Sequence, residues 1–443
     1  MTKTRQILDV LREYESRNIV FREPDGSWPI VWDRARDVHV WDADGEKYLD
    51  LTAAFGVAAA GHANPRVVKA GQKQMARLLH AMGDVHPSAR KAELARKLSR
   101  ITFERWTKKT DPGRQTPNLT AGKVIFGNSG FEAVEAALKT AMLATGKHGI
   151  IAFTGAYHGL GYGALNATHR NFFRGPFHSQ LREFGHFVQF PSRSGDVANV
   201  EWNIRRLFHR EWIGAVLVEP VQGRGGCQVP PREFLPGLRK ICDEQGALLI
   251  LDEIYTGFGR TGKWFACEHS GVTPDLICLG KALTGGFPLS ACVGRADIMD
   301  AAWPASRGEA IHTSTFLGHP VGCAMALAQI KELGKFDLPK HSAELGKFLL
   351  GELQFRLRHA KFQIAVRGLG LMVGVELRLA DGRPATAAVM QALKTMLRRG
   401  YILLPEGEHG NVISFTPPLT ITQAQLAKTA KVLAEVLTTD KHR

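Results

Sequence analysis

The sequence predicts an α/β protein in which a mainly parallel sheet is covered by helices and joined to a smaller α+β domain. From residue 124 onward, short apolar runs typical of buried strands alternate with helical patterns. The apolar run 247–251 ends in Asp252, and the run 276–279 is followed closely by Lys281. Polar residues directly after buried parallel strands lie where α/β sheets bind their ligands. A chain of 443 residues is long enough for two such domains.

The predicted elements divide the chain into several stretches. Residues 28–51 alternate apolar and polar residues around an Asp-Ala-Asp-Gly turn, which predicts a hairpin or a short antiparallel sheet. We assign 1–60 to the N-terminal part of the small domain, 61–325 to the large domain and 326–443 to the C-terminal part of the small domain. The stretch 107–122 is rich in Thr, Pro, Gly and charged residues, which predicts an exposed loop. The expected strands are 124–126, 150–153, 215–218, 247–251, 276–279 and 291–293 in the large domain, and 372–377 and 412–415 in the small domain.

The composition indicates an ordinary globular protein and argues against several classes of function. Hydrophobic residues make up 44% of the chain, and no apolar run reaches about 18 residues, so we expect no transmembrane helix. The polar N-terminus lacks the apolar core of a signal peptide. Six cysteines without a CxxC pair are expected to be reduced thiols, which predicts a cytoplasmic protein without a metal site. The net charge of +15 is spread along the chain without a nucleic-acid-binding motif, so we expect neither nucleic acid nor a membrane as partner.

Lys281 and Asp252 indicate a specific chemistry. A lysine after a buried strand can bind phosphate in a P-loop, but Ala282 and Asp275 stand where that motif needs Ser or Thr and glycine. A desolvated lysine with an acid at a distance instead suits a Schiff base with pyridoxal phosphate (PLP), in which the acid contacts the pyridine nitrogen. A helix cap or an ion pair is the structural alternative for Asp252.

A longer set of residues resembles one enzyme family. Asp252-Glu253 is followed by Gly-Phe-Gly-Arg-Thr-Gly at 257–262, by Pro274-Asp275 and by Gly280-Lys281. This combination is similar to that of the class III aminotransferases of PLP fold type I, which include the 4-aminobutyrate, ornithine and other ω-amino-acid aminotransferases. The similarity extends from about residue 28 to about residue 437. It implies a fold of PLP fold type I and a ping-pong transamination, in which Lys281 binds PLP and moves a proton between substrate and cofactor.

The resemblance also implies the residues that hold the cofactor. Ser129, Gly130 and Phe131 begin a helix after a strand, where free N–H groups suit an anion, so we expect the PLP phosphate there. A plain helix N-cap is the alternative for Ser129, and core packing is the alternative for Tyr157. The other implied contacts are Tyr157 and His158 after the strand 150–153, Gln222 at the phenolic oxygen, Asp252 at the ring nitrogen, Ile254 on the ring face opposite Tyr157, and Thr315, which would reach the PLP phosphate of a partner subunit.

Three positions depart from the family pattern. Phe131 stands where a small residue is usual. Most relatives that process α-amino acids carry an arginine shortly before a Pro-Pro-Leu and a glutamate two residues after the Gln of Val-Gln-Gly, but this chain has Ser414 and Arg224 there. We take both as substrate-binding candidates, with Arg224 meeting the carboxylate of the acceptor or of an acidic donor. The alternative is that Arg224 faces solvent or pairs with Glu406 or Glu408.

The predicted function is the transfer of an amino group from an ω-amino acid or amine donor to a keto acid acceptor. Thr315 predicts a homodimer with shared active sites, and the sequence is also compatible with a tetramer. A PLP-dependent epimerase or aminomutase on the same fold is the main alternative, because function depends on the site and not on the fold. A basic, non-catalytic binding protein is a third interpretation, in which Lys281, Asp252 and Gln222 would serve no chemistry.

Overall fold

The computed structural model describes residues 2–110 and 121–438. Its large sheet has seven strands in the order β4-β10-β9-β8-β7-β5-β6. Strands β9, β8, β7, β5 and β6 are parallel, and β10 runs antiparallel to both of its neighbours. This is the mainly parallel sheet that the sequence predicts. The strands are β4 (Gly122–Gly127), β5 (Gly149–Phe153), β6 (Gly185–Val188), β7 (Ile213–Val218), β8 (Leu248–Asp252), β9 (Leu276–Leu279) and β10 (Ser290–Arg295).

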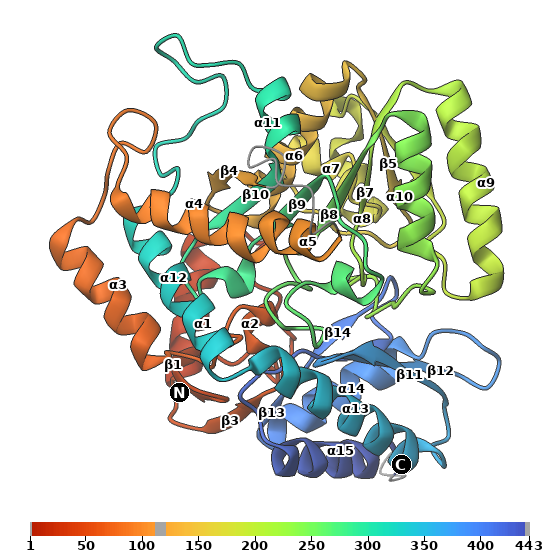
Figure 1. The fold of residues 1–443 in the computed structure, drawn as a ribbon. Helices are drawn as coiled ribbons and strands as arrows, with labels where there is room; N and C mark the ends of the chain where they lie inside the picture. The colour runs from red at the N-terminus through yellow and green to blue at the C-terminus, as the bar shows by residue number, and fades with distance from the viewer. Residues whose placement is uncertain (1, 111–120, 439–443) are drawn as a thin grey trace.

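Helices cover both faces of this sheet (Figure 1). Successive residues of a strand point to opposite faces, so Ala215 and Leu217 of β7 pack with α6, whereas Val216 and Val218 belong to the core on the other face. Because both faces are closed to water, the central strands β7 and β9 are continuous apolar runs, and β8 is apolar up to Asp252 at its end. The covering helices are α6 (Gly130–Thr145) on the first face and α4 (Ala89–Ile101), α9 (Ser194–Arg210) and α10 (Phe234–Gln245) on the second.

Two four-stranded sheets form the rest of the β-structure. One has the order β1-β2-β3-β13, in which β13 from the C-terminal part pairs in parallel with β3 near the N-terminus. The other has the order β11-β12-β15-β14 and packs with α13, α14 and α15 at the bottom of Figure 1. The strands are β1 (Trp32–Arg36), β2 (His39–Asp42), β3 (Lys47–Asp50), β11 (Gln363–Leu369), β12 (Met372–Arg378), β13 (Tyr401–Ile402), β14 (Leu404–Glu406) and β15 (Val412–Phe415).

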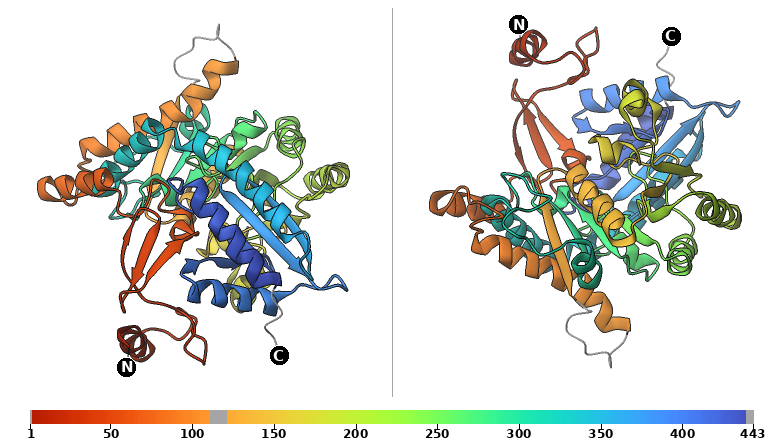
Figure 2. Two further views of the ribbon diagram at one scale, coloured as in Figure 1. Left: turned by 90° about the horizontal axis from the view of Figure 1, so that it is seen from below. Right: turned by 90° about the horizontal axis from the view of Figure 1, so that it is seen from above.

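The remaining helices surround these sheets, and Figure 2 shows α1 apart from the main body at the end marked N. Each helix in the described part of the chain is too short or too polar to span a bilayer. The helices are α1 (Lys3–Tyr14), α2 (Ala53–Gly56), α3 (Pro65–Arg77), α5 (Phe103–Thr110), α7 (Tyr162–Leu165), α8 (Asn171–Arg174), α11 (Ala296–Ala302), α12 (Pro320–Lys335), α13 (Leu338–Leu357), α14 (Thr386–Arg398) and α15 (Gln423–Thr438), with 3-10 helices η1 (Gly175–Gln180), η2 (Ala266–His269) and η3 (Lys281–Leu283).

Each predicted strand of the large sheet is present, and the structure adds β6, which lies at the sheet edge and carries the less apolar sequence Gly-His-Phe-Val. The predicted hairpin at 28–51 is present as β1, β2 and β3. Of the predicted loop 107–122, residues 111–120 lie outside the described residues, whereas its first residues end α5 and Gly122 begins β4. The proposed domain limits remain a prediction, and α12 runs without interruption across the limit at 325.

Candidate active site

A cavity of about 340 Å³ lies at the carboxyl ends of β8 and β9. Its walls include Asp252 and Lys281, which the sequence placed at two neighbouring strand ends, together with Tyr157 and Ile254. Parallel neighbours end at the same edge of a sheet, and β8 and β9 pair in register up to Asp252 and Cys278. The topology therefore brings the acid and the amine, 29 positions apart in the chain, into one pocket.

Asp252 is buried and held by two hydrogen bonds. Its Oδ2 lies 2.7 Å from His158 Nδ1, and its Oδ1 accepts the N–H of Ile254 at 3.0 Å. The loop that carries His158 is fixed in turn, because the His158 N–H donates to Thr168 Oγ1 at 2.9 Å. A buried carboxylate needs such partners to offset the loss of water. His158, expected at the cofactor, thus also orients the acid.

Lys281 follows β9 and lines the same cavity. Its φ of +42° lies in the left-handed region, which residues with a side chain adopt rarely and mostly at functional sites. Burial lowers the pKa of Lys281, and the nearby acids Asp252, Glu219 and Glu406 act in the opposite direction. A lowered pKa increases the fraction of neutral amine, which is the form that attacks a carbonyl and accepts a proton.

Glu219 at the end of β7 is a further acid in the cavity wall, and the sequence did not mark it as a site residue. Its two oxygens accept the N–H groups of Tyr157 and Gly223, each at 3.0 Å. Burial raises the pKa of Glu219 to about 7. Glu219 therefore fixes the backbone on both sides of the cavity and can exist in two protonation states near neutral pH.

The start of α6 forms another side of the cavity through Gly130 and Phe131. Glu132 Oε2 accepts the N–H groups of Asn128 at 2.6 Å and Ser129 at 2.7 Å, which caps the helix. The Gly130 and Phe131 N–H groups belong to the first turn, where an α-helix offers them no acceptor of its own. This end of the helix is therefore suited to an anion, and binding of the PLP phosphate by Ser129, Gly130 and Phe131 stays a prediction.

The Phe131 side chain, unusual at its position, lies against the glycines that follow His158. A Cβ on Gly159 would come within 2.4 Å of Phe131 Cβ, and one on Gly161 within 2.5 Å of Phe131 Cδ2. A Cβ on Gly163 would come within 2.3 Å of Glu135 Oε2, and Glu135 Oε1 accepts the Gly163 N–H at 2.8 Å. The glycines of this loop thus allow close packing on α6.

Four of the predicted site residues lie outside the walls of this cavity. The Gln222 amide donates to the Thr154 carbonyl at 2.8 Å and lines a separate polar cavity. Ser129 takes part in the helix cap just described, and Thr315 is exposed in the segment between α11 and α12. Ser414 is buried in β15, with its Oγ 3.7 Å from Cys227 Sγ. Cofactor or substrate contacts of these four residues remain predictions.

Arg224 lies in the cavity wall, and its side chain is 34% exposed. Its Nε is 3.5 Å from Glu406 Oε2, so the ion-pair alternative that names Glu406 describes this structure. The guanidinium carbon also lies 5.3 Å from the centroid of the Tyr157 ring. Arg224 is therefore part of the pocket and is paired at the same time.

Tyr255 is a pocket residue that the sequence reasoning missed. The Lys281 ammonium nitrogen lies 3.8 Å from the centroid of its ring, and the Tyr255 hydroxyl lies 3.1 Å from Thr416 Oγ1. A Cβ on Gly56 or on Gly223 would come within 2.6 Å of this ring. Two glycines that are distant from Tyr255 in sequence leave the space for its ring. The residues next to Tyr255 in the chain therefore did not mark it as a pocket residue.

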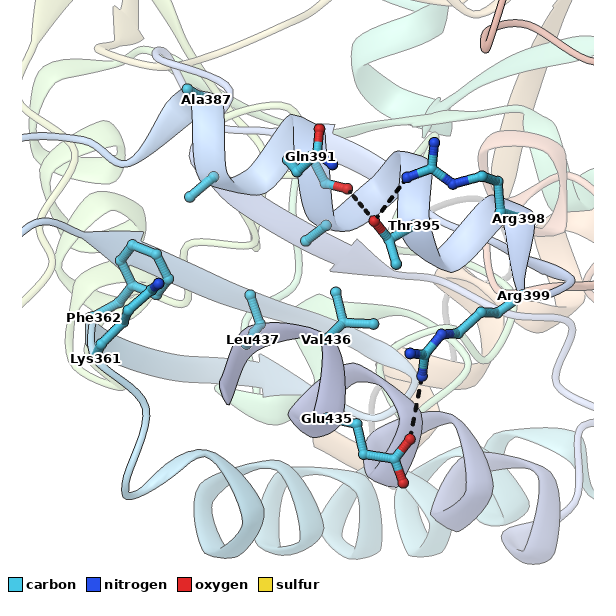
Figure 3. A pocket seen from close by; sticks show the side chains of 12 residues that line it. Lys361, Phe362, Ala387, Gln391, Thr395, Arg398, Arg399, Glu435, Val436 and Leu437 are labelled. Atoms are coloured by element: carbon cyan, nitrogen blue, oxygen red, sulfur yellow. Dashed lines mark hydrogen bonds and ion pairs between the residues drawn. The ribbon is translucent and has the colours of Figure 1, made fainter. Parts of the chain in front are cut away.

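A second cavity of about 560 Å³ lies apart from Lys281, in the C-terminal part of the chain (Figure 3). Helices α14 and α15 form its walls, and Arg399 Nη1 pairs with Glu435 Oε2 at 3.2 Å across one end. Its other labelled side chains mix apolar, polar and basic residues, and none matches a predicted site residue. We assign it no part in the chemistry.

The first cavity fits PLP. Lys281 supplies the primary amine and Asp252 supplies a buried carboxylate in one pocket. Gly130 and Gly280 leave a flat wall over Ile254, because a Cβ on either would lie 3.1 to 3.3 Å from that side chain. Ile254 and Tyr157 are apolar surfaces of the kind that cover an aromatic ring. The residues that would hold the cofactor are thus Lys281, Asp252, Ile254, Tyr157 and the first turn of α6.

Comparison with known proteins gives the family. The family model for class III aminotransferases matches residues 20–437. The chain is 37% identical to a putrescine aminotransferase of Pectobacterium atrosepticum, over 98% of this chain and 88% of the relative. It is also 37% identical to a 5-aminovalerate aminotransferase of Pseudomonas aeruginosa, over 92% of this chain and 93% of the relative.

Solved structures of similar fold are also transaminases. An amine transaminase from an uncultivated Pseudomonas species, in its PLP-bound form, has 28% identity and a TM-score of 0.84, over 96% of this chain and 98% of that chain. An (S)-enantioselective omega-transaminase from Thermomicrobium roseum has 28% identity and a TM-score of 0.86, over 99% and 98%. The epimerase and aminomutase alternative finds no support among these relatives. The chain is a PLP-dependent enzyme and belongs to the class III aminotransferases.

Proposed function

We propose that this aminotransferase takes its amino group from an ω-amino acid or an amine and passes it to a keto acid. The observation that carries the proposal is the uncharged side chain of Ser414, where relatives that process α-amino acids carry an arginine. Ser414 is 4% exposed and faces Cys227. A donor α-carboxylate would find no positively charged side chain at position 414. The named relatives, which act on putrescine and 5-aminovalerate, support an ω-amine donor.

Lys281 performs the proton transfers in this proposal. PLP, when bound, supplies the electron sink that stabilises the negative charge left on the donor carbon. Lys281 Nζ would take the proton from that carbon as a neutral amine, the form that its lowered pKa favours, and give it to the cofactor carbon that receives the amino group. In the half-reaction with the keto acid, Lys281 would move a proton in the opposite direction. Asp252, oriented by His158, would keep a proton on the ring nitrogen.

The cavity walls orient the donor chain and exclude water. Phe131, Tyr157, Leu160 and Ile254 offer apolar contact surface around the amine of Lys281. An uncharged carbon chain gains free energy on these surfaces, about 0.8 kcal/mol for each buried methylene group. Chain length therefore contributes to donor selection, and the reacting amine is presented to Lys281.

We also propose a homodimer with shared sites, in which Thr315 serves the partner's PLP phosphate. Thr315 is exposed and does not line its own cavity. Around it, large apolar side chains are exposed, among them Ile311 (69%), Phe316 (53%) and Met82 (54%). Exposed apolar side chains that cluster mark protein–protein contacts. For the location of the enzyme we propose the cytoplasm, supported by six cysteines that are all free thiols.

A single-turnover experiment tests the donor class. The PLP-loaded enzyme is mixed, without keto acid, with 4-aminobutyrate, β-alanine, ornithine, putrescine, an aryl-alkylamine or L-glutamate, and the cofactor absorbance is followed. We expect fast conversion with the ω-amines and slow conversion with L-glutamate. If L-glutamate is the best donor, another cation replaces the missing arginine and the proposal is wrong.

A further inference from the structure

Three charged side chains meet at the rim of the active-site cavity. Arg224 comes from the loop after β7, Glu406 ends β14, and Arg170 precedes α8; we call them the rim cluster. Glu406 is 3% exposed, whereas Arg224 is one-third exposed and lines the cavity. The rim cluster therefore combines a buried acid with an arginine that can reach a ligand.

The Arg224–Glu406 pair is poorly satisfied. Its nitrogen–oxygen distance is 3.5 Å, and among the described residues neither Arg224 Nε nor Glu406 Oε2 has a hydrogen-bond partner. A buried ion pair recovers the cost of its desolvation only with good geometry and further hydrogen bonds. Little is lost, therefore, when Arg224 exchanges Glu406 for another carboxylate with which it makes short hydrogen bonds.

Arg170 holds this arrangement in place. Its Nη2 donates to the carbonyl of Arg224 at 3.0 Å and to the carbonyl of Gly407, the residue after Glu406. One guanidinium thus joins the two backbone segments that carry the pair. Arg170 also lies close enough to Glu406 to stabilise its negative charge. The exposed Glu408 is the other acid that acts on Arg170.

The rim cluster has an excess of positive charge. Two arginines face one buried carboxylate, so Glu406 keeps a cationic neighbour when Arg224 turns toward the cavity. Without Arg170, the same movement would leave the buried Glu406 with Lys281, the weakest of its three cationic influences, as its remaining cation, which is costly. The side chain of Ser414 itself supplies no competing cation, and it faces Cys227.

We propose that Arg224 binds the carboxylate of the keto acid, and that Arg170 is the positioning residue that releases Arg224 from Glu406. The inference rests on the proposed function and adds the acceptor side of specificity. With an amine donor, Arg224 stays paired with Glu406. With a keto acid, Arg224 pairs with the substrate and Arg170 compensates Glu406. The same cavity then binds the uncharged carbon chain of the amine donor in one half-reaction and the carboxylate of the keto acid in the other.

The test separates the two half-reactions of the PLP-loaded enzyme, with an aryl-alkylamine as donor and pyruvate as acceptor. Arg224→Gln is expected to raise the KM for pyruvate at least about tenfold, the value of a lost charge-assisted hydrogen bond. The donor half-reaction with the aryl-alkylamine should be affected less, because that donor carries no carboxylate. Binding of propionate, an unreactive carboxylate, to the PLP-loaded enzyme is measured by calorimetry and should weaken in parallel.

The Arg170 variants distinguish positioning from folding. Arg170→Gln is expected to weaken pyruvate and propionate binding, because Glu406 then retains Arg224. Adding Glu406→Gln should restore both, since no carboxylate is left to hold Arg224; a structural defect would not be rescued. Arg170→Lys keeps the positive charge and should bind pyruvate and propionate as the parent does. If Arg170→Gln does not fold, Arg170→Lys tests whether the charge at this position is sufficient. Arg174→Gln, in the neighbouring helix and paired with Glu183, is the matched control.

The outcomes separate this inference from the proposed function. Unchanged pyruvate KM and propionate affinity in Arg224→Gln overturn the role of Arg224. Failure of Glu406→Gln to rescue Arg170→Gln overturns the role of Arg170. In both cases an intact donor half-reaction with ω-amines leaves the proposed function standing. If the parent enzyme converts no ω-amine at all, the proposed function fails by itself.

Discussion

Asp252 Oδ2 and His158 Nδ1 lie 2.7 Å apart, and both side chains are almost fully buried. The acid ends β8, and the histidine follows β5, two strands away in the sheet. A second buried pair, Asp50 Oδ2 and His62 Nε2, has the same 2.7 Å separation but lies outside the active-site cavity. The molecule thus contains a matched comparison for the chemical role of the first pair.

The first prediction uses these two pairs. Asp252→Asn removes the negative charge that would hold the proton on the cofactor ring, so we expect kcat to fall about 10²- to 10⁴-fold. His158→Asn should cost less, because the carboxylate remains. Asp50→Asn is the control and should lower the melting temperature while kcat stays near that of the parent. Steady-state kinetics and thermal melts check this; equal kcat losses in Asp252→Asn and Asp50→Asn would contradict it.

The second prediction concerns Glu219 and pH. Burial raises its pKa to about 7, so the folded state holds a proton that the unfolded state releases at lower pH. The stabilising effect of that proton is complete below the unfolded pKa and is lost as the pH rises from about 4.5 to about 7.

Glu219→Gln cannot ionise and should lose this pH dependence. Between pH 5 and pH 8 the cofactor-free parent should lose more stability than the variant, by on the order of 3 kcal/mol at most. Thermal melts of both proteins at the two pH values measure the difference. A parent and variant with parallel pH profiles would show that Glu219 ionises normally.

The third prediction concerns the glycine loop that packs on Phe131. Gly159 has a φ of +109°, and a Cβ there would clash with Phe131 Cβ at 2.4 Å. Gly146 has a φ of +69°, but nothing lies within 4 Å of its Cβ position. Gly146→Ala should therefore cost only the backbone strain, about 1–2 kcal/mol, whereas Gly159→Ala should cost more and also weaken PLP binding. Denaturant unfolding and cofactor titration distinguish them; equal destabilisation by the two variants would refute the clash.

The fourth prediction concerns Tyr255 and Lys281. The ring face 3.8 Å from the ammonium stabilises the charged amine, by about 0.5–2 kcal/mol for such contacts. Tyr255→Phe keeps the ring and should change little, whereas Tyr255→Leu removes it and should lower the pKa of Lys281 further. The rate at which the cofactor-free enzyme binds PLP is followed by absorbance. This rate depends on the fraction of Lys281 that is a neutral amine. Its pH profile should move to lower pH in Tyr255→Leu; a shift of the same size in Tyr255→Phe would assign the effect to the hydroxyl.

Local sequence was sufficient to find six of the seven strands of the large sheet and the reacting groups. The runs that end near Asp252 and Lys281 are continuous and apolar because both faces of the sheet are covered. Buried strands of this kind can therefore be recognised from consecutive apolar residues in the sequence. The family pattern from Asp252 to Lys281 then gave the cofactor. The edge strand β6 was missed, because half of its four residues, Gly185 and His186, are not apolar.

What tertiary structure decided is which side chains meet. Tyr255 reaches Lys281 because Gly56 and Gly223 leave a slot for its ring. Arg224 meets Glu406 and Arg170 because three loops of the chain converge at one rim. The sequence by itself determined the fold class through the periodicity of its apolar runs, and the cofactor and the reaction through the resemblance of its motifs to one enzyme family. The walls of the pocket depend on contacts between residues far apart in sequence, and such contacts leave no periodic or local pattern.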